Sequence, residues 1–273
     1  MAIVTISREL AALGDETARE LAKKLNYRFI DRYALEERIK SYGFAGSKLQ
    51  KYDEKKPSLW ASLSGDRDDY LHYLKSAIFA EACQGNAVFI GRGAAVILKS
   101  VPDTFSVFLA ARPEARIERV KSYFRCDDKR AQHIIEQSDR DREGFHRYFF
   151  NVKWKDACNY HLALNTGHLQ PDLCAETIKY MRDRVITEEM EARSALKIEE
   201  LALAEKIKHR IFYEKEVLIY HLDVSISGSH VLLQGTVNAC AAIDAAVSSA
   251  REAAPDYVIQ PEIQVIHEYS FMP

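Results

Sequence analysis

Apolar residues in the first part of the chain occur in two alternating patterns. Buried strands are predicted at the short apolar runs 3–6, 28–31, 87–90, 104–109 and 161–164. Helices are predicted where apolar residues recur with helical spacing, at 15–25, 33–39, 70–83, 94–98, 114–124 and 172–184. Strands that alternate with amphipathic helices indicate an α/β fold, in which a parallel sheet is covered by helices on both faces.

Two segments of this region depart from the alternation. Residues 41–67 contain Gly, Ser, Lys and Pro without a clean period, which is typical of a mobile insertion that clamps a substrate. Residues 127–151 have a helical pattern, but their charges alternate in sign along Asp139-Arg140-Asp141-Arg142. Taken from the residues alone, this alternation predicts a solvated helix crossed by salt bridges.

The pattern changes after residue 185. Residues 185–208 are rich in Glu, Ala, Lys and Leu, which predicts one long connecting helix, or two with a break. Beyond it the order is strand, strand, helix, strand, at 217–226, 231–237, 239–253 and 257–266. We therefore expect an α/β domain at 1–185, a helical linker at 186–199 and a second, small α/β domain at 200–273.

The start of the chain is a strand, a polar loop and a helix, an order typical of phosphate-binding folds. In such folds, backbone N–H groups of the loop and the helix dipole favour an anion. The Walker pattern G-x-x-x-x-G-K-[ST] is not met, because only Gly14 is present and Asp15 follows it in place of Lys. Residues 11–13 do not easily adopt the positive φ that wraps a phosphate. The simpler alternative is a capped helix after a buried strand.

Further candidates lie where predicted strands end, because ligands of such sheets bind at the carboxyl ends of the strands. Ser7, Asp31, Gly91 and Arg112 occupy these positions. An arginine between two glycines, Gly91-Arg92-Gly93, is well placed to reach a phosphate, but these residues are also explained by a turn with a surface charge. Asp31 could equally be a helix N-cap.

Composition limits the possible functions. The formal net charge is -2 and there is no long basic tract, which argues against a dedicated nucleic-acid binder. No apolar run approaches the roughly 20 residues of a membrane span, and the N-terminus becomes acidic too early for a signal peptide. The five cysteines are scattered and no metal-ligand spacing occurs, so we expect a reduced, cytoplasmic compartment and no protein-held metal.

Several segments occur along the chain in one order: Ile3 to Glu9, Ala18 to Leu25, Phe29 to Arg32, Tyr52 to Ser58, Gly91 to Ala94, Asn159-Tyr160 and Leu164 to Thr166. In content, order and spacing they resemble the cytidylate kinase-like family, a divergent branch of the nucleoside monophosphate kinases, over roughly residues 1–185. The resemblance implies a P-loop kinase fold with the first strand at its centre. It departs at the loop, where the family typically has Gly-Ser-Gly-Gly-Arg and this chain has Ala11-Ala12-Leu13-Gly14-Asp15.

The resemblance implies transfer of a phosphoryl group from ATP to a nucleoside monophosphate, CMP or dCMP, with Mg²⁺. Catalytic roles are expected for Arg92 and for two arginines of a lid segment, Arg142 and Arg140, because a guanidinium group matches phosphate oxygens. Phosphate or nucleotide contacts are expected at Ser7, Arg8, Gly14, Asp15, Thr17, Asp31, Arg32, Gly91 and Gly93.

The degenerate loop leaves two functions open. Phosphoryl transfer depends on cations around the phosphates, so the missing lysine implies an activity that is weak or lost unless Arg8, Arg92 and Arg142 compensate. The alternative is an inactive nucleotide-sensing or scaffolding pseudokinase that acts through its C-terminal domain. Asp15 favours this alternative, because a carboxylate close to a polyanion repels it by roughly several kcal/mol.

The C-terminal strands carry a second resemblance, to a BON domain, which is a small α/β module. It rests on the pattern Val224…Gly228…Val231-x-Leu233-x-Gly235-x-Val237. An ACT-like regulatory module is the alternative, and neither places catalytic residues here. The small-residue face of helix 239–253 suits tight packing or a homodimer contact.

Overall fold

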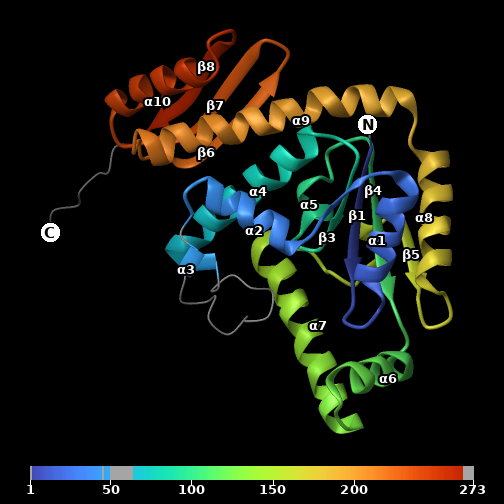
Figure 1. Cartoon of the computed structure of the whole chain (residues 1–273). Helices are drawn as coiled ribbons and strands as arrows, with labels where there is room; N and C mark the ends of the chain where they lie inside the picture. Colours follow the sequence, from blue (N-terminus) through green and yellow to red (C-terminus); the bar gives the residue numbers. More distant parts are fainter. Residues whose placement is uncertain (1, 45, 50–63, 267–273) are drawn as a thin grey trace, which may run out of the picture. The chain divides into compact units, whose positions relative to one another are not determined.

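The computed structural model describes residues 2–44, 46–49 and 64–266 (Figure 1). The chain divides into two compact units, Met1–Ala195 and Leu196–Pro273. Most of the insertion predicted at 41–67, with the family segment Tyr52 to Ser58, lies outside the described residues.

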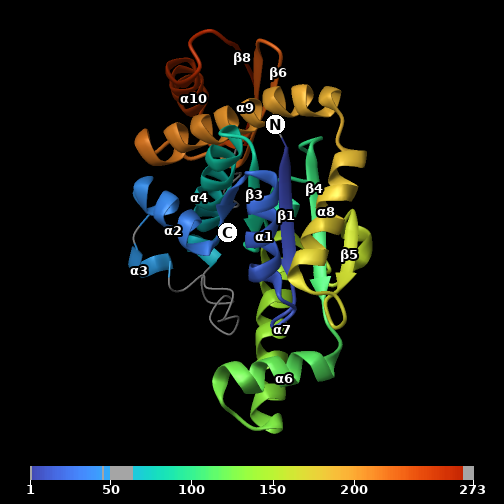
Figure 2. The same ribbon diagram turned by 45° about the vertical axis from the view of Figure 1, so that its right-hand side comes forward.

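The first unit contains a five-stranded parallel sheet with the order β2-β3-β1-β4-β5. Its strands are β1 (Ile3–Arg8), β2 (Arg28–Ile30), β3 (Ala87–Ile90), β4 (Thr104–Ala110) and β5 (Leu162–Asn165). Its helices are α1 (Gly14–Leu25), α2 (Arg32–Ser41), α3 (Gly46–Leu49), α4 (Ser64–Cys83), α5 (Ala94–Ile97), α6 (Pro113–Phe124), α7 (Asp128–Phe150), a 3-10 turn at Ala157–Asn159, and α8 (Pro171–Val185). Figures 1 and 2 show α1 and α8 over one face and α4 and α5 over the other. The predicted α/β fold is confirmed.

Strand β1 lies at the centre of the sheet because its sequence tolerates burial on both faces. Residues 3–7 are all at most 5% exposed, and the strand pairs in parallel with β3 on one side and β4 on the other. Val4 and Ile6 share an apolar core with Leu21 of α1 and Ile178 of α8. Because the strands are parallel, the loops after β1, β3 and β4 leave the sheet at the same edge.

The second unit is built around a mixed three-stranded sheet with the order β6-β7-β8. Its elements are β6 (Tyr220–Ser227), β7 (His230–Val237), α10 (Cys240–Ala253) and β8 (Val258–Val265). β6 and β7 are antiparallel, whereas β7 and β8 are parallel and joined through α10. This is the strand, strand, helix, strand order expected from the sequence.

Helix α9 (Glu188–His209) runs across the division between the units and continues into a π-helical turn, Arg210–Glu214. The sequence predicted a helical linker at 186–199, and the first half of α9 occupies that stretch. No helix in the described part of the chain is both long and apolar enough to cross a membrane.

Candidate functional site

The loop between β1 and α1 bends through left-handed backbone conformations without glycine. Ala11 has a φ of 59° and Leu13 a φ of 53°. The expectation that residues 11–13 would avoid positive φ is therefore wrong for two of the three. A left-handed conformation costs an L-residue roughly 1–2 kcal/mol, so other interactions must hold this loop.

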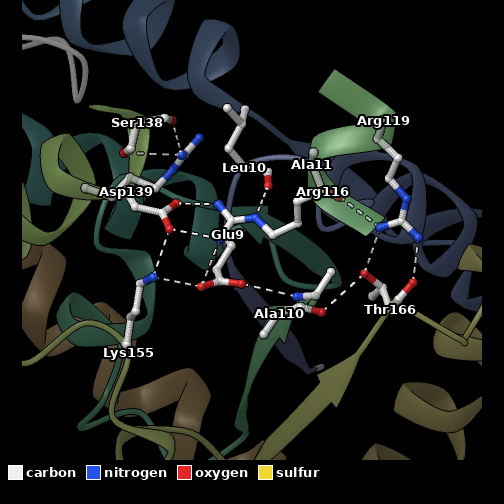
Figure 3. Close-up of polar contacts among 12 residues, drawn as sticks. Glu9, Leu10, Ala11, Ala110, Arg116, Arg119, Ser138, Asp139, Lys155 and Thr166 are labelled. Carbon is white, nitrogen blue, oxygen red and sulfur yellow. Dashed lines mark hydrogen bonds and ion pairs between the residues drawn. The ribbon is translucent and has the colours of Figure 1, made fainter. Parts of the chain in front are cut away.

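Side chains from distant elements hold the loop by its carbonyl oxygens (Figure 3). Three consecutive oxygens each accept one such hydrogen bond: Leu10 O from Arg116 Nε at 2.8 Å, Ala11 O from Arg119 Nη1 at 2.9 Å, and Ala12 O from Thr166 Oγ1 at 3.0 Å. The two arginines belong to α6, and the threonine follows β5. The loop is therefore anchored to the elements beside it on the β4–β5 side of the sheet.

The carbonyl contacts determine where the loop N–H groups point. In a trans peptide, the N–H of a residue points opposite to the C=O of the residue before it. The N–H groups of Ala11 and Leu13 are thus directed away from Arg116 and Thr166, while that of Ala12 donates to Glu9 O at 3.3 Å. Successive N–H groups on one side of such a turn form a concave anion site.

The start of α1 extends this arrangement. Its N-cap residue is Leu13, and no side chain caps the first turn. Among the described residues, the N-cap side chain therefore leaves the first-turn N–H groups able to bind an anion, and the alternative of a capped helix without a ligand stays open. Asp15 and Glu16 lie in this turn, and both are exposed.

A charge cluster fixes the beginning of the loop. The carboxylate of Glu9 contacts Lys155 Nζ at 2.8 Å and Arg116 Nη1 at 3.3 Å, and it accepts from the Ala111 N–H at 3.2 Å. The same two cations bind Asp139 of α7, Arg116 through two hydrogen bonds at 2.7 and 3.0 Å and Lys155 at 2.8 Å. Two carboxylates thus balance two cations beside the loop (Figure 3).

The pKa values in this cluster reflect the pairing. Burial by itself raises the pKa of Asp139, but the hydrogen bonds from Arg116 and Lys155 outweigh it and hold the pKa below its usual range. Burial lowers the pKa of Lys155, while its contacts with Asp139 and Glu9 raise it above the usual value. Both shifts favour the charged forms of Asp139 and Lys155 at neutral pH.

Arg8 is the cation placed at the start of α1. A Cβ atom added to Gly14 would lie 2.4 Å from Arg8 Cγ and 2.8 Å from its Cβ, so the arginine stem runs against the first residue of the helix. Gly14 is needed here for close approach, since no positive φ is recorded for it.

Two other candidates of this stretch face the interior. The Ser7 hydroxyl hydrogen-bonds that of Tyr160, which donates to Trp154 O at 2.8 Å. Thr17 is fully buried, and its hydroxyl has no hydrogen-bond partner among the described residues. Their proposed contacts with phosphate stay predictions.

The turn after β3 is left-handed at three consecutive residues, Gly91 (φ 72°), Arg92 (φ 53°) and Gly93 (φ 70°). Arg92 is only 3% exposed, and its Nη2 binds Glu36 Oε1 at 2.8 Å, so the alternative of a surface charge is wrong. Gly93 lies against α7, where an added Cβ would be 2.3 Å from the ring of Phe150.

The residues predicted at Asp31 and Arg32 begin α2. Asp31 caps this helix by accepting from the Ala34 N–H at 3.0 Å, which is the simpler of the two roles considered for it. Arg32 Nε binds Glu36 Oε1 at 2.6 Å, and this is the carboxylate oxygen that also binds Arg92.

The lid arginines lie on α7. Arg142 is buried and donates to the Ser138 hydroxyl one turn earlier, whereas Arg140 is exposed and contacts Gln137 at 3.3 Å. The α7 residue that reaches the loop cluster is Asp139. The catalytic roles expected for Arg92, Arg142 and Arg140 stay predictions.

Sequence reasoning did not single out Arg116, Arg119, Lys155, Glu9 or Asp139. One signal was available for the two arginines. Arg116 and Arg119 are three positions apart in the helix after β4, which places their side chains on one face of α6.

The group implied by the family is ATP with Mg²⁺. The uncapped N–H groups and the left-handed loop fit the phosphates of a nucleotide. Among the described residues, no group of three or more His, Cys, Asp or Glu side chains could hold a metal ion, and the Thr17 hydroxyl is enclosed. We therefore derive no step through a protein-held metal.

A model of the Cytidylate kinase-like family matches residues 3–168, more than half of the chain. This chain belongs to the cytidylate kinase-like family. Membership of this family indicates a nucleotide-binding, kinase-like protein. The family match covers the loop between β1 and α1, the left-handed turn after β3 and the α6 arginines.

Two solved structures are similar in fold. The crystal structure of an uncharacterized protein from Eubacterium ventriosum ATCC 27560 shares 22% identity over 67% of this chain and 99% of its own, with a TM-score of 0.53. Shikimate kinase from Bacteroides thetaiotaomicron shares 15% identity over 67% of this chain and 97% of its own, with a TM-score of 0.41. At these identities the similarity concerns the fold alone. No functionally curated protein gives a significant match to the chain.

Proposed function

We propose that this family member binds the phosphate groups of a nucleotide at the loop between β1 and α1, and that its phosphoryl transfer is weak or lost. The observation that carries the proposal is the orientation of the loop. Side chains bind Leu10 O and Ala12 O, which directs the N–H groups of Ala11 and Leu13 away from those side chains.

Positive charge at this site comes from Arg8, whose stem lies against Gly14. An arginine suits the role because its guanidinium stays charged and donates in a fork that matches phosphate oxygens. The nucleotide is ATP, with CMP or dCMP as the acceptor if transfer occurs.

We expect weak transfer because the other cations near the loop are bound to carboxylates or carbonyl oxygens. Arg116 and Lys155 are neutralised by Glu9 and Asp139, and Arg119 is bound to carbonyl oxygens. No lysine lies between Glu9 and Thr17, and the first turn of α1 contributes carboxylates instead. Fewer cations around the transferring phosphate mean less stabilisation of the transition state.

The second candidate is an inactive nucleotide sensor or scaffold that acts through the BON-like or ACT-like C-terminal unit. It is favoured by the two exposed carboxylates of the first turn, Asp15 and Glu16, which oppose a bound phosphate. It differs from the first in having no transfer at all.

Calorimetric titration of the full-length chain with ATP, CMP and dCMP tests binding, and a coupled assay with each nucleoside monophosphate and Mg²⁺ tests transfer. Binding with slow turnover supports the first candidate, and binding without turnover supports the sensor. Absence of binding to every nucleotide contradicts both.

Two substitutions locate the binding at the loop. Arg8→Met should weaken ATP binding by roughly tenfold, and Asp15→Arg should strengthen it by roughly several-fold. Arg193→Met, at an exposed position of α9 within the first unit, is the control and should leave affinity unchanged. Equal affinities for all four proteins would place the nucleotide elsewhere.

A further inference from the structure

Thr166 is held rigidly where β5 ends. Its N–H donates to Ala110 O at 2.8 Å and its carbonyl accepts from Arg119 Nη2 at 2.6 Å. Both backbone groups are thus fixed, and the residue is only 1% exposed. Its side chain therefore has a defined direction.

That direction is toward the loop. The hydroxyl lies 3.0 Å from Ala12 O and 3.2 Å from Ala110 O, but it has a single proton to donate. Ala12 O is the nearer acceptor, and Ala110 O already accepts the Thr166 N–H, so we assign the hydroxyl proton to Ala12 O. This is the contact that turns the Leu13 N–H the other way.

Arg119 completes the connection. One guanidinium nitrogen donates to Ala11 O at 2.9 Å and the other to Thr166 O at 2.6 Å (Figure 3). A planar fork can span two carbonyl oxygens in this way, whereas a lysine ammonium is a point charge on a flexible stem. Thr166 and Arg119 therefore join the loop after β1 to the end of β5.

We infer that Thr166 and Arg119 are positioning residues for the phosphate site, and that they replace the glycines that P-loops normally use. Ala11 and Leu13 adopt positive φ only while their neighbouring carbonyls are held. Without the Thr166 contact the Ala12–Leu13 peptide rotates, and Ala12 O replaces the Leu13 N–H on the anion side, where it repels phosphate. Arg119 supports this contact by holding both Ala11 O and Thr166 O in place. The inference rests on the function proposed above.

The experiment compares full-length Thr166→Val, Thr166→Ser and Arg119→Lys with the unmodified protein. Thr177→Val is the matched control, since the Thr177 hydroxyl also donates to a carbonyl, Leu173 O at 2.8 Å, but in an exposed hydrogen bond within α8. Affinities for inorganic phosphate and ATP are measured by calorimetry well below the melting temperature.

Thr166→Val and Arg119→Lys should each weaken binding about tenfold, and Thr166→Ser, which keeps the hydroxyl, should stay within about twofold. Thr177→Val should match the unmodified protein. A lower melting temperature with unchanged affinity in Thr166→Val and Arg119→Lys would mean a purely structural role and would overturn the inference.

A second measurement separates this inference from the proposed function. Hydrogen exchange of the segment 10–14, followed by mass spectrometry without ligand, should be faster by about fivefold or more in Thr166→Val and Arg119→Lys but not in Thr177→Val. We call the contacts of Thr166 and Arg119 with the loop carbonyls the clamp. If the unmodified protein binds neither probe, the proposed function fails, yet accelerated exchange still shows that the clamp holds the loop. Unchanged exchange would contradict the clamp whatever the binding result.

Discussion

The loop after β1 and the turn after β3 leave neighbouring strands at the same edge of the sheet and both pass through left-handed conformations. The turn does so mainly with glycine, at Gly91 and Gly93. The loop does so with Ala11 and Leu13, and side chains that are distant in sequence bind its carbonyl oxygens. A left-handed backbone can thus be specified locally, by residue type, or at long range, by tertiary hydrogen bonds.

The difference has consequences for the sites. The glycine turn carries a buried arginine that is already bound to Glu36. The clamped loop carries N–H groups that its own carbonyl contacts direct away from the neighbouring elements. The phosphate site proposed above is therefore at the loop, whereas the arginine of the turn already has a carboxylate partner.

The largest expected loss of stability comes from disrupting the charge cluster that fixes the loop. Arg116→Ala removes the donor to Leu10 O and leaves the buried Glu9 and the half-buried Asp139 to share the exposed Lys155. Removing one partner from a fully buried ionic network costs about 3–5 kcal/mol, so for this partly buried one we expect a loss of about 2–4 kcal/mol. Urea unfolding followed by tryptophan fluorescence reports on the first unit, because the two tryptophans are at positions 60 and 154.

The control is an ion pair of the same kind at the surface. Arg147 binds Glu143 at 2.7 Å on α7, and the two side chains are 71% and 48% exposed. Arg147→Ala should cost less than about 0.5 kcal/mol. Equal losses in both variants would show that the cluster does not hold the loop.

The glycine turn should be the next most sensitive. Gly93→Ala combines a left-handed φ of 70° with a Cβ placed 2.3 Å from Phe150, and we expect a loss of about 2–4 kcal/mol in the same assay. Gly43→Ala is the control, since Gly43 has a φ of 93° with nothing within 4 Å of an added Cβ. It should lose only about 1 kcal/mol. If both variants lose the same amount, packing against α7 does not constrain the turn.

The start of β4 offers a carboxylate without the pairing that protects Glu9 and Asp139. Asp103 is fully buried. Burial raises the pKa of its carboxyl to about 6; the hydrogen bond from Ser194 lowers the pKa but is outweighed, and the charge of nearby Glu191 raises it further. The Ser194 hydroxyl beside it accepts the Asp103 N–H at 2.7 Å.

The sign of the effect on stability follows from proton binding. The folded protein holds the Asp103 proton up to a higher pH than the unfolded chain, whose pKa is near 3.8. Stability is therefore lost as pH rises from about 4 to above 6, by about 3 kcal/mol in full. Asp103→Asn should be more stable than the unmodified protein at pH 8, by up to this amount, and by only about 1 kcal/mol at pH 4.5. A gain that does not change with pH would rule out ionisation as its cause.

The sequence predicted the order of strands and helices because hydrophobic periodicity is a local property. Element ends were less accurate, as where β1 continues through Ser7 and Arg8 beyond its apolar run. The pairing of parallel strands with both neighbours buries these polar residues, which periodicity does not reveal.

The site was predicted only in part. The position of the loop and of Arg8 followed from the strand-loop-helix order, whereas the loop conformation did not. The donors to Ala11 O and Ala12 O lie 108 and 154 positions further along the chain, so no local sequence pattern predicts these contacts. Rules based on glycine content consequently fail to predict left-handed conformations in a loop that tertiary contacts hold.

The smallest expected effect tests that conclusion most directly. Ala11→Gly removes the cost of the left-handed conformation, roughly 1 kcal/mol, but increases the entropy of the unfolded chain by nearly as much. In the unmodified protein we expect stability to change by less than about 0.5 kcal/mol and ATP affinity by less than about twofold.

In the Thr166→Val background the same substitution should behave differently. There the clamp is weakened, and glycine lets residue 11 reach positive φ without it, as Gly91 and Gly93 do after β3. We expect Ala11→Gly to restore ATP affinity by about two- to fivefold in this background, measured by calorimetry as a double-mutant cycle. Ala12→Gly is the matched control, because Ala12 has no positive φ, and it should restore nothing. Equal effects of Ala11→Gly in both backgrounds would mean that the conformation of residue 11 does not depend on the clamp. The loop after β1 and the turn after β3 would then not differ in how their backbones are held.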